Sequence, residues 1–201
     1  MTKDHYKILG VDPGTQVLGY AVIEIQKQNI SVLDIGEIHL TKYENHQEKL
    51  KEIFLQLQEI IETYLPAELA VESPFYGKNV QSMLKLGRAQ GVAMAAGMTM
   101  GLNITEYSPK SIKQSITGNG NSSKEQVAAM LRSMLNYKWD SKLLDATDAL
   151  GAAVTHFHQK KFGINIKSKS GNNWSSFIKN NPKRVICTAE IQFICKLIPH
   201  A

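Results

Sequence analysis

The chain contains few cysteines and lacks a long apolar run. Only two of its 201 residues are cysteine, Cys187 and Cys195, and both lie near the C-terminus. A disulfide framework or a cysteine-based metal site therefore does not organise the domain, and a reducing, cytoplasmic location is expected. The most apolar stretch, residues 91–102, is shorter than the roughly 18 residues of a membrane span, and the first residues do not have the pattern of a secretory signal. We expect no association with a membrane.

Charge is distributed unevenly along a sequence of otherwise ordinary composition. Hydrophobic residues make up 43% and charged residues 20%, which excludes a disordered or collagen-like chain. The net charge is +5, but residues 1–74 carry 6 basic and 12 acidic side chains, whereas residues 75–138 carry 8 and 2. Segregation of this kind is compatible with basic segments that meet a polyanion around an acidic centre.

The hydrophobic pattern predicts an α/β fold with a mixed sheet. Apolar, β-branched runs around the turn DPGT, and a third run after the polar QKQN, are typical of an antiparallel meander of strands. Short strands and helices then alternate. The expected strands lie near residues 6–12, 17–25, 30–40, 69–73 and 104–108, and the expected helices near residues 48–65, 80–102, 108–116, 124–135 and 144–161. Ser122 and Glu125 have the spacing of a capping box before the fourth helix.

The regular pattern ends close to Phe162. Beyond it, Lys, Ser, Asn and Gly predominate up to about residue 186. We expect residues 1–162 to form one folded domain and residues 163–201 to form a basic, flexible C-terminal tail.

Four carboxylates occupy positions that suggest a shared site. Asp12 and Glu72 each end an apolar strand, and Asp145 and Asp148 are three apart at the start of the last helix. Simpler roles exist for three of them: Asp12 can form a turn, and the two helix acids can serve as an N-cap and a first-turn acid. Glu72 is harder to explain in this way, because a buried charge is costly unless it is paired or bound to a metal.

Together the four acids can converge at the carboxyl edge of the sheet. Crowded carboxylates repel and raise one another's pKa unless cations neutralise them. Oxygen ligands without cysteine favour Mg²⁺, with Mn²⁺ as a substitute, over Zn²⁺. Two such ions about 3.5–4 Å apart activate water and stabilise the leaving oxygen in phosphodiester hydrolysis.

Four segments resemble the signature blocks of the RuvC family of bacterial Holliday junction resolvases. They are ILGVDPGTQVLGYAVI, AVESPFYGKNVQSMLKLGRAQGVA, KSIKQSITGNGNSSKEQV and DATDALGAAVTH, in order over residues 7–158. The resemblance implies an RNase H-like fold with a mixed five-stranded sheet and helices on both faces. It also implies a homodimeric, Mg²⁺-dependent endodeoxyribonuclease, with two ions per subunit, that nicks opposed strands of a four-way junction symmetrically in homologous recombination and DNA repair. A branch-migration helicase complex of the RuvA and RuvB type is the implied partner.

The resemblance also assigns residues. The catalytic and metal-binding acids correspond to Asp12, Glu72, Asp145 and Asp148, without substitution. The sequence departs from the family's pattern at Ser73 and Pro74, which bears on DNA contacts rather than on the chemistry.

Four further residues are expected to bind DNA. Phe75 matches a position thought to stack on a junction base, and Lys113 and Lys124 match basic positions near the scissile strand. Lys78 lies in the same loop as Phe75. The alternatives are a loop anchor for Phe75 and an ordinary solvated surface for the lysines.

Two other readings stay open at this point. The turn DPGT after a strand is also how actin-like and sugar-kinase folds hold ATP phosphates, although only one such turn is present in this sequence. A non-enzymatic protein could bind junctions and use the four acids only to hold a stabilising ion. Catalytic turnover discriminates between this reading and the nuclease.

Overall fold

The computed structural model describes residues 5–74, 79–137, 139 and 143–162. The expected tail, residues 163–201, lies outside the described residues, so the predicted domain division stays a prediction. The strands are β1 (His5–Asp12), β2 (Val17–Gln26), β3 (Asn29–His39), β4 (Glu68–Glu72) and β5 (Asn103–Tyr107). The helices are α1 (His46–Tyr64), α2 (Val80–Thr99), α3 (Pro109–Thr117), α4 (Lys124–Leu135) and α5 (Leu144–Phe162).

The sheet is mixed and has five strands in the order β3-β2-β1-β4-β5. β1, β2 and β3 form the antiparallel meander expected from the sequence. β4 and β5 run parallel to β1, because the connections before them pass through helices α1 and α2. The carboxyl ends of β1, β4 and β5 therefore lie at one edge of the sheet.

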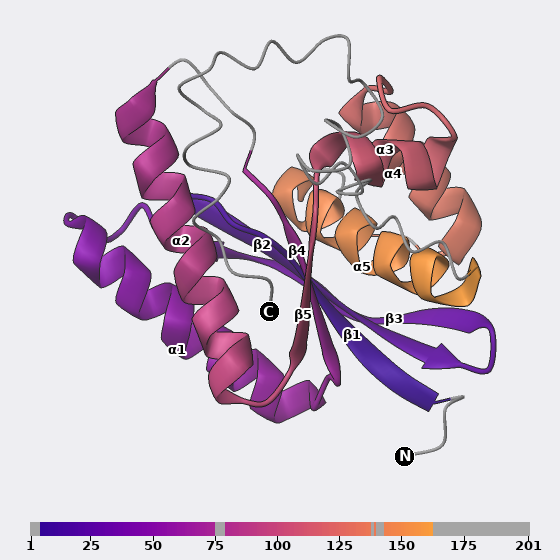
Figure 1. The fold of residues 1–201 in the computed structure, drawn as a ribbon, viewed down its shortest axis with the longest axis horizontal. Helices are drawn as coiled ribbons and strands as arrows, with labels where there is room; N and C mark the ends of the chain where they lie inside the picture. The colour runs from indigo at the N-terminus through magenta and orange to yellow at the C-terminus, as the bar shows by residue number, and fades with distance from the viewer. Residues whose placement is uncertain (1–4, 75–78, 138, 140–142, 163–201) are drawn as a thin grey trace, which may run out of the picture. The chain divides into compact units, whose positions relative to one another are not determined.

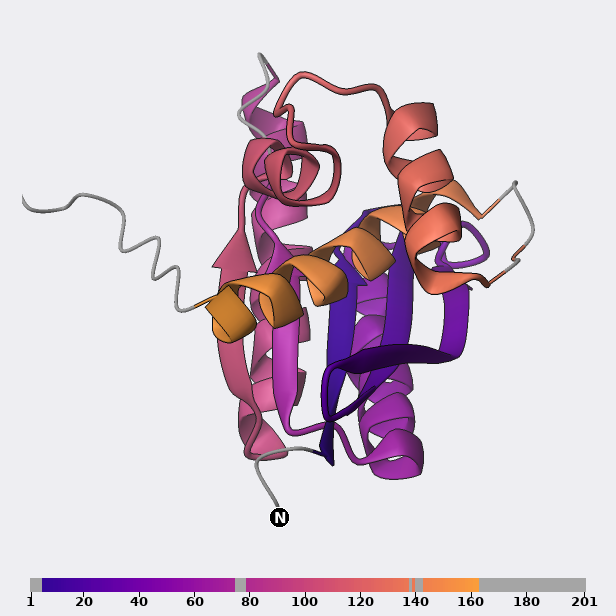
Figure 2. The ribbon, with the colours of Figure 1, turned by 90° about the vertical axis from the view of Figure 1, so that its right-hand side faces the viewer.

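Helices cover both faces of the sheet. α1 and α2 lie over one face, and α5 with α3 and α4 lies over the other (Figures 1 and 2). Alternate residues of a strand point to opposite faces, so β1 supplies Leu9 to the core under α1 and α2 and Ile8 to the core under α5. The predicted α/β architecture, with helices on both faces of a five-stranded sheet, is confirmed.

Helix α5 lies unusually close to the sheet at two glycines. A Cβ atom placed on Gly10 of β1 would lie 2.1 Å from the carbonyl oxygen of Ala149, and one on Gly19 of β2 would lie 2.1 Å from the carbonyl oxygen of Asp145. Such distances are far shorter than a van der Waals contact, so neither site accepts a side chain without movement of α5. The face of α5 toward the sheet is correspondingly small, with Ala146 and Ala153 fully buried.

One local prediction is wrong. The capping box of α4 is formed by Ser123 and Gln126, not by Ser122 and Glu125. The Ser123 backbone N–H donates to the Gln126 side chain at 2.9 Å, and the Gln126 N–H donates to the Ser123 hydroxyl at 3.3 Å. Ser122 is buried instead, with its hydroxyl 2.7 Å from that of Thr117.

In the described part of the chain, none of the helices has both the length and the hydropathy of a membrane span.

Candidate metal centre

The packing of α5 explains why acids from distant segments meet. Asp12 ends β1 and pairs with Gly19 of β2 in the ladder. The same glycine is in contact with the backbone of Asp145, so the first turn of α5 lies directly over the end of β1. Asp148 follows one turn later, on the same side of the helix.

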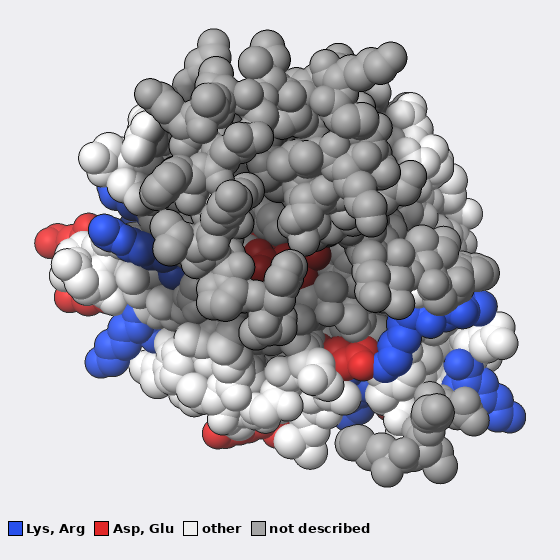
Figure 3. All heavy atoms as spheres, viewed as in Figure 1, with Lys and Arg blue, Asp and Glu red and all other residues white. Residues whose placement is uncertain are grey.

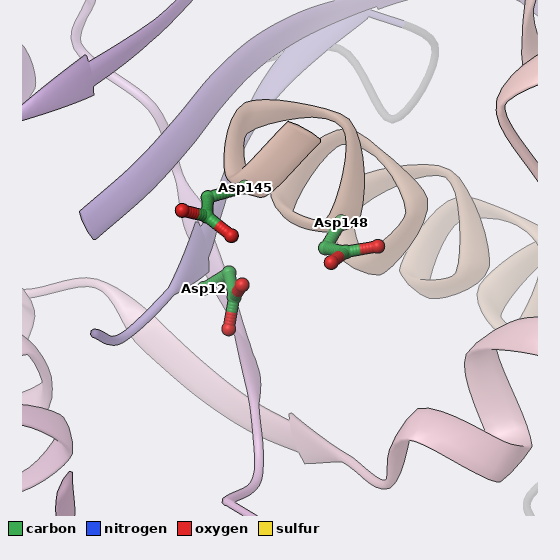
Figure 4. A group of neighbouring side chains, drawn as sticks. All are labelled: Asp12, Asp145 and Asp148. Atoms are coloured by element: carbon green, nitrogen blue, oxygen red, sulfur yellow. The ribbon is translucent and has the colours of Figure 1, made fainter. Parts of the chain in front are cut away.

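Three of the predicted acids form a compact group. Asp12, Asp145 and Asp148 each offer a carboxylate oxygen, and these oxygens lie within 4.8 Å of one another. Figure 4 shows Asp12 reaching from the end of a strand toward the two aspartates of the helix. The convergence that sequence spacing only permitted is present in the fold.

Glu72 lies next to this group rather than within it. It is the last residue of β4, and it lines a pocket of about 380 Å³ together with Asp12 and Asp145. The pocket is also bordered by the turn after β1 and by Pro74 and Pro109. All four predicted acids therefore lie at the same edge of the sheet, with three of them in immediate proximity.

The electrostatics show that these carboxylates are poorly neutralised. Burial, reinforced by the charges of Asp148 and Asp145, raises the pKa of Asp12 from 3.8 to about 7. Burial, reinforced by Asp12 and Asp148, raises the pKa of Glu72 from 4.5 to about 8. Burial also raises the pKa of Asp148, against the opposing effect of Lys124. Without a bound metal ion, some of these carboxylates are therefore protonated near neutral pH.

One cation of the described chain reaches the acids directly. Lys124 Nζ donates to Asp148 Oδ2 at 2.5 Å. Burial opposes the charged form of Lys124, but the hydrogen bond and the neighbouring charges of Asp148 and Asp12 raise its pKa. One ammonium in direct contact does not balance four carboxylates. The set of oxygen donors, and the charge left uncompensated, fit one or more divalent cations.

The structure separates the four predicted DNA contacts into two groups. Phe75 and Lys78 lie outside the described residues. Lys113 on α3 is partly buried, and its positive charge opposes the rise in the pKa of Glu72 and of Asp148 that burial causes, so this charge lies close to the acids. Lys124 lies in contact with them. Figure 3 shows acidic side chains near the middle of one face, with Lys and Arg to both sides.

The sequence model of the RuvC family, described as crossover junction endodeoxyribonuclease RuvC, matches residues 8–156. The chain belongs to the RuvC family. RuvC of Cytophaga hutchinsonii is 57% identical over 89% of this chain and 87% of its own length. RuvC of Christiangramia forsetii is 54% identical over 89% of this chain and 92% of its own.

Solved structures of RuvC proteins have the same fold. RuvC of Thermus thermophilus, in complex with a Holliday junction substrate, is 28% identical, with a TM-score of 0.74 over 79% of this chain and 97% of that one. The yeast mitochondrial Holliday junction resolvase Ydc2 is 16% identical, with a TM-score of 0.59, and shows the fold alone. The RNase H-like fold expected from the sequence is thereby confirmed.

A second polar cluster, between β4 and α5, was not predicted from the sequence. Glu68, at the start of β4, accepts from His156 Nε2 at 2.9 Å and is also bonded by Lys160. His156 Nδ1 lies 2.7 Å from the hydroxyl of Tyr107. Glu68 and Glu72 are four apart on one strand, so both face α5. This four-residue spacing is the sequence signal that could have indicated the cluster. The cluster links the start of β4 to the C-terminal half of α5, the helix that carries Asp145.

Proposed function

We propose that this RuvC protein is a cytoplasmic, Mg²⁺-dependent endodeoxyribonuclease that resolves four-way DNA junctions by symmetric, paired nicks during homologous recombination and DNA repair. The observation that carries the proposal is the group formed by Asp12, Asp145 and Asp148, with Glu72 beside it on the wall of the same pocket. The match of residues 8–156 to the RuvC family supports the reaction class.

Each acid has a role in this mechanism. Asp12 and Glu72 are the principal metal ligands, and Asp145 and Asp148 complete the ligand set. Two Mg²⁺ ions, for which Mn²⁺ can substitute, supply Lewis acidity to the scissile phosphate and to the attacking water when they are bound. One of the two helix acids orients or deprotonates that water. Burial raises the pKa of Asp148, which makes its carboxylate a stronger base toward that water.

Basic and aromatic residues complete the substrate site. Lys113 and Lys124 contact phosphates near the scissile bond and offset charge in the transition state. Phe75 stacks on a junction base, and Lys78 contacts the backbone. The junction complex solved for Thermus thermophilus RuvC, which is similar in fold over 79% of this chain, supports four-way DNA as the substrate.

The proposed assembly is a homodimer in which each subunit cuts one of two opposed strands. Residues 1–162 form the nuclease domain, and residues 163–201 form a basic tail. A helicase complex of the RuvA and RuvB type is proposed as the partner that moves the branch point to the preferred cleavage sites.

The decisive test is cleavage of a synthetic mobile four-way junction in Mg²⁺. Wild type should give paired symmetric nicks, whereas Asp12→Asn should bind the junction and leave it intact. Glu62→Gln, which changes an exposed acid on α1, is the matched control and should cleave like wild type. If folded, dimeric wild type binds the junction but does not cleave it, the protein is a structural junction-binding protein and not a nuclease.

A further inference from the structure

The contact between Lys124 and Asp148 joins two helices at the acid group. Lys124 is the first residue of α4, and Asp148 lies on α5. Their side chains are 52% and 16% exposed. The ammonium thus reaches the acids from the solvent side, while the carboxylate belongs to the partly buried group with Asp12 and Asp145.

The ammonium of Lys124 is bonded to a carboxylate oxygen of Asp148 that a bound metal ion would also use. Asp148 Oδ2 accepts from Lys124 Nζ at 2.5 Å, and Asp148 is one of the three carboxylates close enough to share an ion. Like charges repel strongly at such separations when water is partly excluded. A divalent cation bound by Asp148 and an ammonium on the same carboxylate therefore compete.

The backbone of Lys124 is fixed, whereas its side chain is free to change partner. The capping box of Ser123 and Gln126 holds the first turn of α4, and Val127 and Leu131 are buried against α5. Rotation of the four-carbon stem of the lysine, which is flexible and ends in a compact charge, is enough to move the ammonium away from Asp148.

We propose that Lys124 is a displaceable cation that holds the acid group together in the metal-free protein and leaves Asp148 when the metal binds. The freed ammonium then becomes available to a DNA phosphate. The inference rests on the proposed metal-dependent function. It adds a competition between Lys124 and the metal ion for Asp148, which a lysine that only binds DNA would not show. It links metal loading to the appearance of a positive charge at the substrate surface.

Mn²⁺ binding without DNA tests the competition. Its dissociation constant can be measured by isothermal titration calorimetry, and free Mn²⁺ by electron paramagnetic resonance. Lys124→Met, which keeps the length of the side chain and removes its charge, should bind Mn²⁺ roughly tenfold more tightly than wild type, the effect of losing one partly buried ionic contact. Lys124→Arg keeps the charge and should bind like wild type.

Lys113→Met is the matched control for long-range charge. Lys113 acts on Asp148 and Glu72 through space, so its removal should tighten Mn²⁺ binding by less than about threefold. Unchanged or weaker binding by a folded Lys124→Met protein would overturn the displacement, as would equal tightening by both variants.

The proposed metal site itself is tested separately by Asp12→Asn. Loss of Mn²⁺ binding in Asp12→Asn, together with an unchanged dissociation constant in Lys124→Met, refutes only the displacement. Equal binding by Asp12→Asn and wild type refutes the proposed metal site. Urea unfolding of each variant establishes that the proteins compared are folded.

Discussion

Replacement of Glu72 by glutamine should stabilise the metal-free protein at alkaline pH. The folded-state pKa of Glu72 is about 8, against 4.5 for an ordinary glutamate. Between these values the folded state binds more protons than the unfolded chain, so the free energy of unfolding falls as pH rises. The stabilising effect of the protonated form is complete below about pH 4.5 and is lost as pH rises through 8. Glu72→Gln removes this dependence.

The magnitude follows from the same two pKa values. A difference of this size corresponds to at most about 5 kcal/mol, at about 1.4 kcal/mol per pKa unit. Between pH 5 and pH 9 the free energy of unfolding of wild type should therefore fall by up to roughly 4 kcal/mol more than that of Glu72→Gln. The carboxyl is partly buried, and its charge is shared with Asp12, so a measured difference of about 2–4 kcal/mol agrees with the structure.

Urea unfolding in the presence of a chelator, followed by circular dichroism at several pH values, measures this difference. Glu62→Gln serves as the control for an exposed acid and should parallel wild type. Saturating Mg²⁺ should reverse the order, because wild type gains stability from the bound ion and Glu72→Gln gains less. Parallel curves for wild type and Glu72→Gln from pH 5 to pH 9 would refute the assignment of Glu72 to a charge-crowded site.

Three further outcomes are expected. Metal binding at pH 7 should release protons, because the pKa values of Asp12 and Glu72 are about 7 and 8 without metal; the affinity should rise with pH and level off above about 8, as measured by calorimetry in buffers of different ionisation enthalpy. His156→Ala should lower the free energy of unfolding by about 1–3 kcal/mol, because Glu68 loses a partly buried partner, while cleavage per folded molecule is unchanged. Gly19→Ala should displace α5, weaken Mn²⁺ binding at least about tenfold and lower the free energy of unfolding by more than about 2 kcal/mol. Gly91→Ala is the control, because a Cβ at that position meets no neighbour; it should raise the midpoint of urea unfolding.

The strands and the acid positions were predictable from sequence for a physical reason. Apolar runs that end in Asp12 and Glu72 predict strand ends, and parallel strands bring their carboxyl ends to one edge. The contact of Lys124 with Asp148 was not predictable, because it depends on how α4 packs against α5. The capping box of α4 was misassigned by one residue, since two adjacent serines offer the same local signal and tertiary burial of Ser122 decides between them.

The close contact of α5 with the sheet has a consequence for the choice of ion. At Gly19 the backbone of Asp145 already touches the strand that pairs with Asp12, so the gap between the two acids is limited by main chain against main chain. The helix therefore cannot come closer to the strand at this position. Calcium forms longer bonds and takes more ligands than magnesium, so we expect it to bind these acids in a different arrangement and to inhibit cleavage in competition with the smaller ion. The absence of a side chain at Gly19 thus sets how close Asp145 can come to Asp12.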